Sequence, residues 1–326
     1  MLILGLQGSP RKGGNTDTLL AAFLEKAARA GASVDTVQVA RVGIVPCKGC
    51  GFCEKHGTCV IADDPMSTEI FGRLRRADLV VAASPVFFYG VTAQLKGLID
   101  RCQTLWSRKY VFKLKDPLAN TRKGLLLSVA ASRGRQLFDG IQLTTKYFFD
   151  AIDARFEHSL TYRGVEAKGD ISRQEGLAAD LDAAVARTVL PLVTRKKVLF
   201  VSPHGACRAP MAAALAQERL GTAIRTDFGA RAPADELSPG MAAAMQALGV
   251  DLGYRRPQPL EAAFAGHRPD VIIDIGDGKG PVPIPGVETE QWTLVEPTSL
   301  DEAALKGLRH QIEARIDTLR PLVGLN

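Results

Sequence analysis

The sequence has few aromatic residues and no long hydrophobic run. Aromatics account for 6% of the 326 residues, and no uninterrupted apolar stretch reaches the ~18 residues that suggest a membrane helix. The N-terminus has no basic region before its short apolar run and no cleavage-site pattern, so no signal peptide is indicated. We therefore expect a cytoplasmic protein with no membrane partner.

The sequence also has no strong excess of positive or negative residues. The net charge is +6, and Lys and Arg are scattered among acids apart from short clusters at Arg73–Arg76 and Arg195–Lys197. Such a pattern is typical of a solvated surface and not of a nucleic-acid-binding stripe. We expect no nucleic-acid partner, while the mild positive charge favours anionic ligands such as phosphates.

Cysteine is scarce outside one short segment. Four of the six cysteines lie in PCKGCGFCEKHGTC, at Cys47, Cys50, Cys53 and Cys59. In a long chain without an export signal, such a cluster indicates metal or redox use and not a disulfide scaffold. The C-x2-C-x2-C run is typical of iron–sulfur ligation; zinc fits less well, and a segment without a cofactor is a further alternative. Cys102 is expected in the core, and His56 in a solvated turn.

Short apolar strands alternate with amphipathic helices in both halves of the chain. This alternation predicts an α/β protein with parallel, doubly wound sheets. The expected strands are Leu2–Leu6, Val34–Val39, Leu79–Ala83, Gly124–Val129, Phe156–Tyr162, Val198–Val201, Ile224–Phe228 and Val271–Ile275. We place a domain boundary near Thr194, which gives domains 1–194 and 195–326.

Two loops in the first half follow predicted strands and carry binding chemistry. Gly8–Thr16 precedes a predicted helix, and a helix start offers unpaired amides to an anion. Ser84–Gly90 can place backbone and aromatic groups beside a flat ring. Taken alone, the first loop could equally be a well-capped turn, and the second a turn with core phenylalanines.

Four ordered motifs in this half, GSPRKGGNT, PCKGCGFC, CVIADD and SPVFFYGVTAQLKGLIDR, resemble the NAD(P)H-dependent FMN reductase and iron–sulfur flavoprotein family. The resemblance covers about residues 1–165 and implies a flavodoxin-like fold that binds FMN. It places the phosphate on Ser9, Arg11, Asn15 and Thr16. It places the ring beside Pro85, Val86, Phe87, Phe88, Tyr89 and Gly90, with Ser132 and Gly134 of a third loop at its other edge.

The second half resembles low-molecular-weight tyrosine phosphatases and arsenate reductases. The stretch VLFVSPHGACRAPM is similar to their C-x5-R-[ST] oxyanion loop, but Ser202 stands where the nucleophilic cysteine is expected. Because a hydroxyl is far less acidic than a thiol, covalent catalysis is not expected here. A noncatalytic anion site at Ser202, Gly205, Cys207 and Arg208, or a docking surface, remains. Glu296 stands at the position of the family's general-acid Asp.

These features predict an FMN-dependent oxidoreductase, in which the flavin and not a side chain carries the chemistry. A [4Fe–4S] cluster at the four cysteines, NAD(P)H or a protein as electron donor, and a small molecule or protein as acceptor are expected. The resemblance also implies a homo-oligomer. The alternatives are a plain NAD(P)H:flavin or quinone reductase without a cluster, and a redox-responsive binding module.

Overall fold

The chain forms two compact units. The computed structural model describes residues 1–263, 268–276, 284, 286–294, 301–322 and 324. The first unit comprises Met1–Lys113 and Thr121–Thr194, and the second comprises Leu114–Asn120 and Arg195–Asn326. The chain therefore enters the second unit briefly at Leu114–Asn120 before it returns to complete the first.

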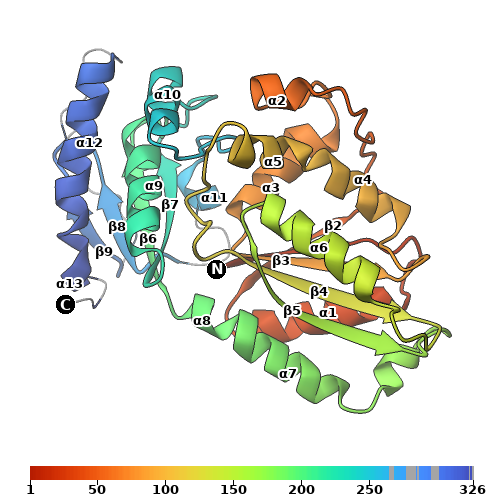
Figure 1. Ribbon diagram of the computed structural model, residues 1–326. Helices are drawn as coiled ribbons and strands as arrows, with labels where there is room; N and C mark the ends of the chain where they lie inside the picture. The colour runs from red at the N-terminus through yellow and green to blue at the C-terminus, as the bar shows by residue number, and fades with distance from the viewer. Residues whose placement is uncertain (264–267, 277–283, 285, 295–300, 323, 325–326) are drawn as a thin grey trace. The chain divides into compact units, whose positions relative to one another are not determined.

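The first unit is built on a five-stranded sheet (Figure 1). Its strands are β1 (Leu2–Gln7), β2 (Ser33–Gln38), β3 (Leu79–Pro85), β4 (Lys123–Ala130) and β5 (Arg155–Arg163). Every pairing is parallel and the order is β2-β1-β3-β4-β5. The order reverses between β1 and β3, which is the flavodoxin-like arrangement, and ligands of such sheets bind at this switch point. The predicted fold class is confirmed.

Helices cover both faces of this sheet. They are α1 (Asn15–Arg29), α2 (Phe52–His56), the π-helical turn η1 (Met66–Ile70), α3 (Phe71–Arg76), α4 (Ala93–Arg101), α5 (Gln103–Tyr110), α6 (Asp139–Ala151), the 3-10 turn η2 (Asp170–Arg173), α7 (Leu177–Thr188) and α8 (Leu190–Val193). In Figure 1, α1 and α7 lie below the sheet and α3 to α6 lie above it. Because both faces are covered, β3 and β4 are buried along nearly their whole length.

The second unit has a smaller parallel sheet in the order β7-β6-β8-β9. Its strands are β6 (Lys196–Ser202), β7 (Ile224–Ala230), β8 (Val271–Asp274) and β9 (Glu288–Gln291), and its helices are α9 (Arg208–Leu220), α10 (Pro239–Ala247), α11 (Leu260–Ala263), α12 (Glu302–Ile316) and α13 (Leu319–Leu322). Among the described residues, no helix of either unit is long and apolar enough to span a membrane.

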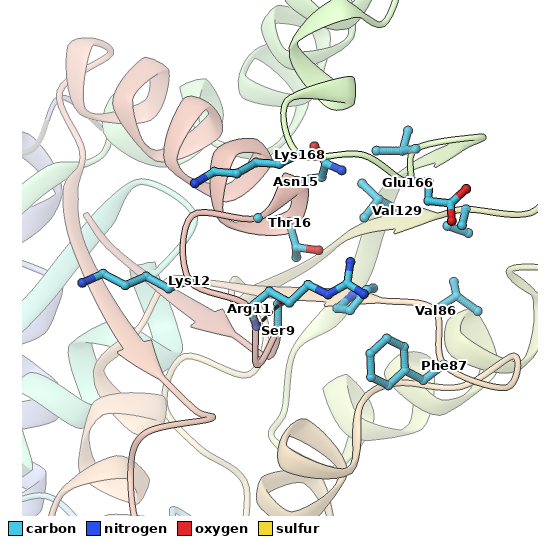
Figure 2. A pocket seen from close by; sticks show the side chains of 15 residues that line it. Ser9, Arg11, Lys12, Asn15, Thr16, Val86, Phe87, Val129, Glu166 and Lys168 are labelled. Atoms are coloured by element: carbon cyan, nitrogen blue, oxygen red, sulfur yellow. Dashed lines mark hydrogen bonds between the residues drawn. The ribbon is translucent and has the colours of Figure 1, made fainter.

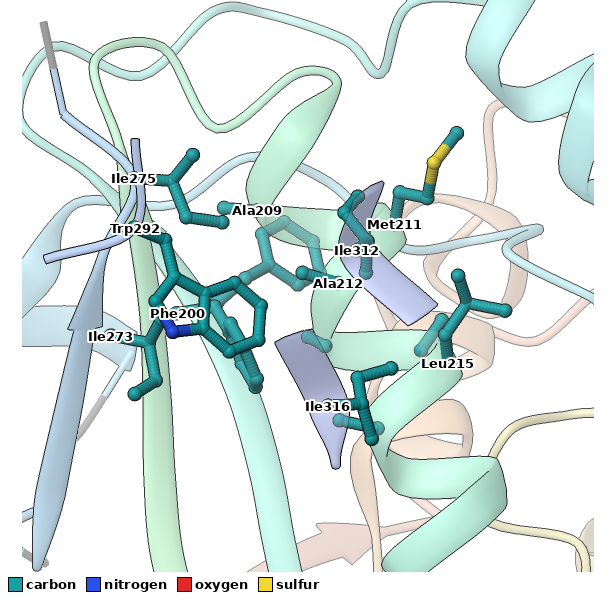
Figure 3. Close-up of a cluster of buried hydrophobic side chains, with 14 of the residues drawn as sticks. Phe200, Ala209, Met211, Ala212, Leu215, Ile273, Ile275, Trp292, Ile312 and Ile316 are labelled. Atoms are coloured by element: carbon teal, nitrogen blue, oxygen red, sulfur yellow. The ribbon is translucent and has the colours of Figure 1, made fainter. Parts of the chain in front are cut away.

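Trp292 lies at the centre of the second unit's core (Figure 3). Its ring meets Phe200 of β6 edge-on, with ring centroids 5.6 Å apart, and its indole N–H donates to Glu290 at 3.0 Å. Met211 of α9 and Ile312 of α12 belong to the same cluster. A large aromatic with its polar atom satisfied stabilises this interior strongly, so Trp292 has a structural role.

Candidate functional site

A cavity of about 270 Å³ opens at the carboxyl ends of β1, β3 and β4. Figure 2 shows the residues that line it, which belong to four separate loops. The lining residues are Ser9, Arg11, Lys12, Gly14, Asn15, Thr16, Pro85, Val86, Phe87, Val129, Ala130, Ala131, Val165, Glu166 and Lys168. The volume is near the lower end for ligand pockets, and the position is the switch point of the sheet.

The first loop presents an anion-binding end of this cavity. The N-cap of α1 is Gly14, which offers no side-chain cap, so the first amides of the helix are left for another acceptor. The backbone N–H of Arg11 donates to Ser9 Oγ at 3.2 Å, which fixes the turn. Figure 2 shows the Arg11 side chain extended across the cavity toward Val86.

Asn15 holds a second loop against the start of α1. Its Nδ2 donates to Ala167 O at 2.9 Å, and its Oδ1 accepts from Gly169 N at 3.0 Å and Ile171 N at 3.3 Å. The side-chain amide is thus engaged with the chain after β5. This contact brings Lys168 to the cavity, with its Nζ beside Gly13. Sequence motifs did not point to Lys168 or Glu166, because only the folded chain brings residues this far apart together.

The ring-side loop has an unusual backbone. Phe88 and Tyr89 both have positive φ, 47° and 64°, which is uncommon for aromatic residues and marks a tight, over-determined turn. Phe87 and Gly90 close the turn by exchanging backbone hydrogen bonds of 3.0 and 2.9 Å. As a result, Phe87 lines the cavity, whereas the Phe88 side chain is fully exposed.

The cavity contains only part of the predicted ring site. The predicted residues outside its lining are Phe88, Tyr89, Gly90, Ser132 and Gly134. Two of them lie close to each other, since the Tyr89 hydroxyl is 3.6 Å from the position that a Cβ on Gly134 would occupy. The phosphate residues and Pro85, Val86 and Phe87 are brought together, with Ala131 as the third loop's contribution.

Thr92, the N-cap of α4, joins the two loops that begin at Gly8 and Ser84. Its hydroxyl donates to Gly8 O at 2.6 Å and accepts from Leu95 N at 3.3 Å. Its own N–H donates to Ser84 Oγ at 3.1 Å. The side chain is fully buried, so α4 starts from a fixed point between the two loops.

The four clustered cysteines line a second cavity, of about 590 Å³. All four are free thiols; Cys47 and Cys50 are exposed, while Cys53 and Cys59 are half-buried. The N–H of Gly49 donates to Cys47 Sγ at 3.5 Å. His56 is exposed at the end of α2 and stacks on Phe52.

The donor set of this second cavity is one that iron–sulfur clusters accept. Four thiols with amide and hydroxyl donors nearby, including Ser107 Oγ at 3.5 Å from Cys53 Sγ, are typical of cluster ligation. Among the described residues, however, no three potential ligands converge closely enough to hold a metal ion as placed. Cys102 is separate from this set, since it is buried and burial raises the pKa of its thiol.

The second unit carries the predicted oxyanion loop between β6 and α9. Ser202 is buried, and its Oγ accepts from Gly205 N at 3.2 Å. Arg208 is buried at the first position of α9, and Cys207 is half-buried before it. The loop therefore brings the four predicted residues together, although the Ser202 hydroxyl already accepts one of its amides. Glu296 lies outside the described residues.

Arg231 and Asp274 flank this loop at the carboxyl ends of β7 and β8. The fully buried Asp274 carboxylate accepts from Arg231 at 2.6 Å and from Gln291 Nε2 at 2.9 Å. Backbone bonds of 2.9 and 3.0 Å tie Pro203 and His204 to the segment after Arg231. A fixed negative charge is thus balanced by a cation close to the loop.

Comparison with known proteins assigns the first unit. A model of the family described as NADPH-dependent FMN reductase matches residues 1–152. Iron-sulfur flavoprotein MJ1083 of Methanocaldococcus jannaschii is 35% identical over 148 residues, which are 45% of this chain and 72% of that protein. The chain belongs to the iron-sulfur flavoprotein family. The iron-sulfur flavoprotein of Methanosarcina thermophila is 41% identical over 133 residues, 41% of this chain and 65% of that protein, so just under two thirds of its length is matched.

The FMN reductase unit and the second unit also have neighbours among solved structures. An NADH:FMN oxidoreductase (EMOB, apo form) has a TM-score of 0.42 at 15% identity and covers 58% of this chain and 88% of its own. An arsenate reductase in the phosphate binding state has a TM-score of 0.34 at 24% identity, and the match covers 38% of this chain and 95% of that one. The two units are thus similar to different solved proteins.

Proposed function

We propose that the protein binds FMN in the first cavity and passes electrons from NAD(P)H, through an iron–sulfur cluster at the four cysteines, to a small-molecule or protein acceptor. The observation that carries this proposal is the pair of cavities in one unit, one at the switch point and one lined by all four clustered thiols. The relatives named iron-sulfur flavoproteins support the second cofactor.

In this proposal, residues at one end of the first cavity bind the phosphate. Ser9 and the open amides at the start of α1 donate hydrogen bonds, and Arg11 and Lys168 supply positive charge. At the other end, Pro85, Val86 and Phe87 lie beside Val129 and Ala130, which gives an apolar wall that would exclude water from one side of a ring. Bound FMN would supply two-electron chemistry with the nicotinamide and one-electron chemistry with the cluster.

The cysteine side chains would hold the cluster as a [4Fe–4S] centre. Four thiolates are the ligand set for such a cluster. Cys47 already accepts a weak hydrogen bond from an N–H group and Cys53 one from an O–H group. Hydrogen bonds to the sulfurs of a cluster change its reduction potential.

For the second unit we propose noncatalytic oxyanion binding or docking. Ser202 has a hydroxyl in place of a thiol, and this hydroxyl accepts a hydrogen bond from the backbone N–H of Gly205. We therefore assign Ser202 a role in the shape of the loop and not in nucleophilic attack. Arg208 at the start of α9 would supply the charge. A homo-oligomer remains part of the proposal because Phe88, next to the cavity-lining Phe87, and Tyr147 of α6 are large aromatic side chains that lie exposed.

Anaerobic reduction of the bound flavin tests the electron path. Mixing the protein with NADPH or NADH should bleach the flavin band first and the cluster absorbance afterwards. A Cys50→Ala variant should keep the first phase and lose the second. Flavin that neither nucleotide reduces would exclude NAD(P)H as the donor.

A further inference from the structure

Arg101, the last residue of α4, joins the two ends of the cysteine segment. Its guanidinium donates to Val45 O at 2.7 Å, two residues before Cys47, and to Ile61 O at 3.1 Å, two residues after Cys59. The side chain is 1% exposed. One buried cation thus closes residues 45–61 into a loop whose ends are held a fixed distance apart.

Asp64 completes this clamp. Its two carboxylate oxygens accept from Arg101 at 2.5 and 2.9 Å in the bidentate geometry that makes such pairs strong. The same carboxylate accepts the backbone N–H groups of Val45 at 3.0 Å and Ser67 at 3.2 Å. Burial opposes ionisation of Asp64, but the hydrogen bonds from Arg101, Val45 and Ser67 outweigh it and hold its pKa below the usual range.

Arg101 also faces the thiols. It lines the cysteine cavity together with Cys59 and the other three. An arginine side chain keeps its charge in a protein, and the bidentate pair with Asp64 holds the guanidinium in place. A fixed positive charge therefore stands beside one of the four sulfurs.

We propose that Arg101 is a positioning residue for the proposed cluster: it fixes the cysteine segment in its ligating shape, and its charge beside Cys59 favours the more negative, reduced state. The proposal rests on the cluster assigned above. One-electron reduction adds a negative charge, which a nearby buried cation stabilises. Net charge and hydrogen bonds to sulfur are known levers on cluster potentials. Replacing Arg101 by a neutral residue therefore lowers the midpoint potential.

The alternative is an ion pair that serves only to stabilise the unit. Buried pairs of this kind destabilise a protein when one partner is removed, whatever lies near them. Arg122 provides a matched control, because it is equally buried and donates to backbone carbonyls of Ala77 and Ile152. It does not line the cysteine cavity.

The positioning role is tested in metal-free protein by hydrogen–deuterium exchange. Arg101→Gln and Arg101→Lys should speed exchange of the amides in residues 45–61 by about tenfold or more, because a charge-assisted contact that closes the segment is lost. Arg122→Gln should leave that segment unchanged relative to the rest of the unit. Equal exchange in the wild-type protein and both Arg101 variants would overturn the positioning role.

The electrostatic role is tested by potentiometry on the cluster-loaded protein. Arg101→Gln should lower the midpoint potential, and Arg101→Lys, which keeps the charge, should stay closer to the wild type. Unchanged potentials in Arg101→Gln would overturn this role. If the wild-type protein takes up no cluster, the proposed cluster function fails and so does the electrostatic role, while the exchange experiment still decides whether Arg101 positions the segment.

Discussion

At the scale of single residues, the proposed FMN site uses Arg11 and Lys168, which line the first cavity, as the cations that would distinguish FMN from riboflavin. Changing either one to Ala should weaken FMN binding roughly tenfold, because a hydrogen bond to a charged group contributes about 1.5–3 kcal/mol and each 1.4 kcal/mol is tenfold. Titration of flavin-free protein measures this, with Lys146→Ala on α6 as control. Equal losses for FMN and riboflavin would show that neither side chain contacts the phosphate.

Gly140 is a second residue on which the flavin site depends. A Cβ at this position would come within 2.5 Å of the Tyr89 carbonyl oxygen, so the turn at Phe88 and Tyr89 can pack on α6 only if residue 140 is glycine. We expect Gly140→Ala to move this turn and weaken flavin binding.

The control for Gly140 is Gly97→Ala in α4, where a Cβ would meet nothing within 4 Å. This change should stabilise the protein by about 0.5–1 kcal/mol, because glycine is a poor helix former. Urea unfolding and flavin titration of both variants give the comparison. Gly140→Ala with unaltered flavin affinity would argue against the packing role of that turn.

At the scale of elements, the excursion of Leu114–Asn120 into the second unit depends on Asp116. Its fully buried carboxylate pairs with Arg255 at 3.2 Å and accepts from Leu118 N at 2.8 Å. Asp116→Asn should destabilise the second unit by about 3–5 kcal/mol, as expected when a buried pair is broken. Fluorescence of Trp292 in a Trp106→Phe background follows its unfolding.

Asp317 supplies the surface comparison for this experiment. It pairs with Arg219 at 3.1 Å, and both side chains are about half exposed. Asp317→Asn should lower the free energy of unfolding by less than about 1 kcal/mol. If Asp116→Asn lowers the free energy of unfolding by no more than Asp317→Asn does, the ion pair of Asp116 does not hold the Leu114–Asn120 segment.

The sequence predicted the central elements well and the peripheral ones poorly. Buried strands such as β3 and β4 are continuous apolar runs, so composition alone identifies them. The edge strand β9, with sequence ETEQ, has no such run and was not predicted. The helical stretch after β3 is divided at Cys102 into α4 and α5.

The candidate site was predictable to the extent that local motifs define it. Ser9, Arg11 and the four cysteines stand in short motifs, and the fold brings each set to one cavity. Lys168 reaches the cavity because Asn15 holds the flanking residues Ala167 and Ile171, 152 and 156 positions further along the chain. Arg101 contacts Asp64 across 37 positions. Lys168 stands in no recognised motif. Arg101 ends the SPVFFYGVTAQLKGLIDR motif, but no local pattern shows its contact with Asp64, which only the folded chain reveals.

At the scale of the whole molecule, stability should fall in acid in two steps. Burial and Arg187 hold the pKa of His158 below 6.5, although Asp180 and Glu157 oppose this. The unfolded chain therefore binds the proton at higher pH than the folded chain, so stability decreases as the pH falls below about 6.5. His158→Gln should flatten this step when urea unfolding is compared at pH 7.5 and 5.5.

The second step belongs to the carboxylates. Burial raises the pKa of Asp150, but hydrogen bonds from Tyr110 and Lys109 outweigh this and hold it below 3.8. A lowered carboxylate pKa gives stability that is present above the ordinary value and lost as the pH falls through the folded one. Asp150→Asn should therefore reduce the steepness of unfolding below about pH 4, and an unchanged slope would contradict this assignment.

The most direct test of the two-cofactor function is to count iron, sulfide and FMN in anaerobically purified protein and to record its absorption spectrum. We predict one FMN and about four irons with four sulfides per chain, the content of a [4Fe–4S] cluster on four cysteines, and loss of the iron in Cys50→Ala with the flavin retained. Flavin bands without iron would contradict the cluster and leave a plain flavin reductase with a structural cysteine segment. Absence of flavin would contradict the function as a whole.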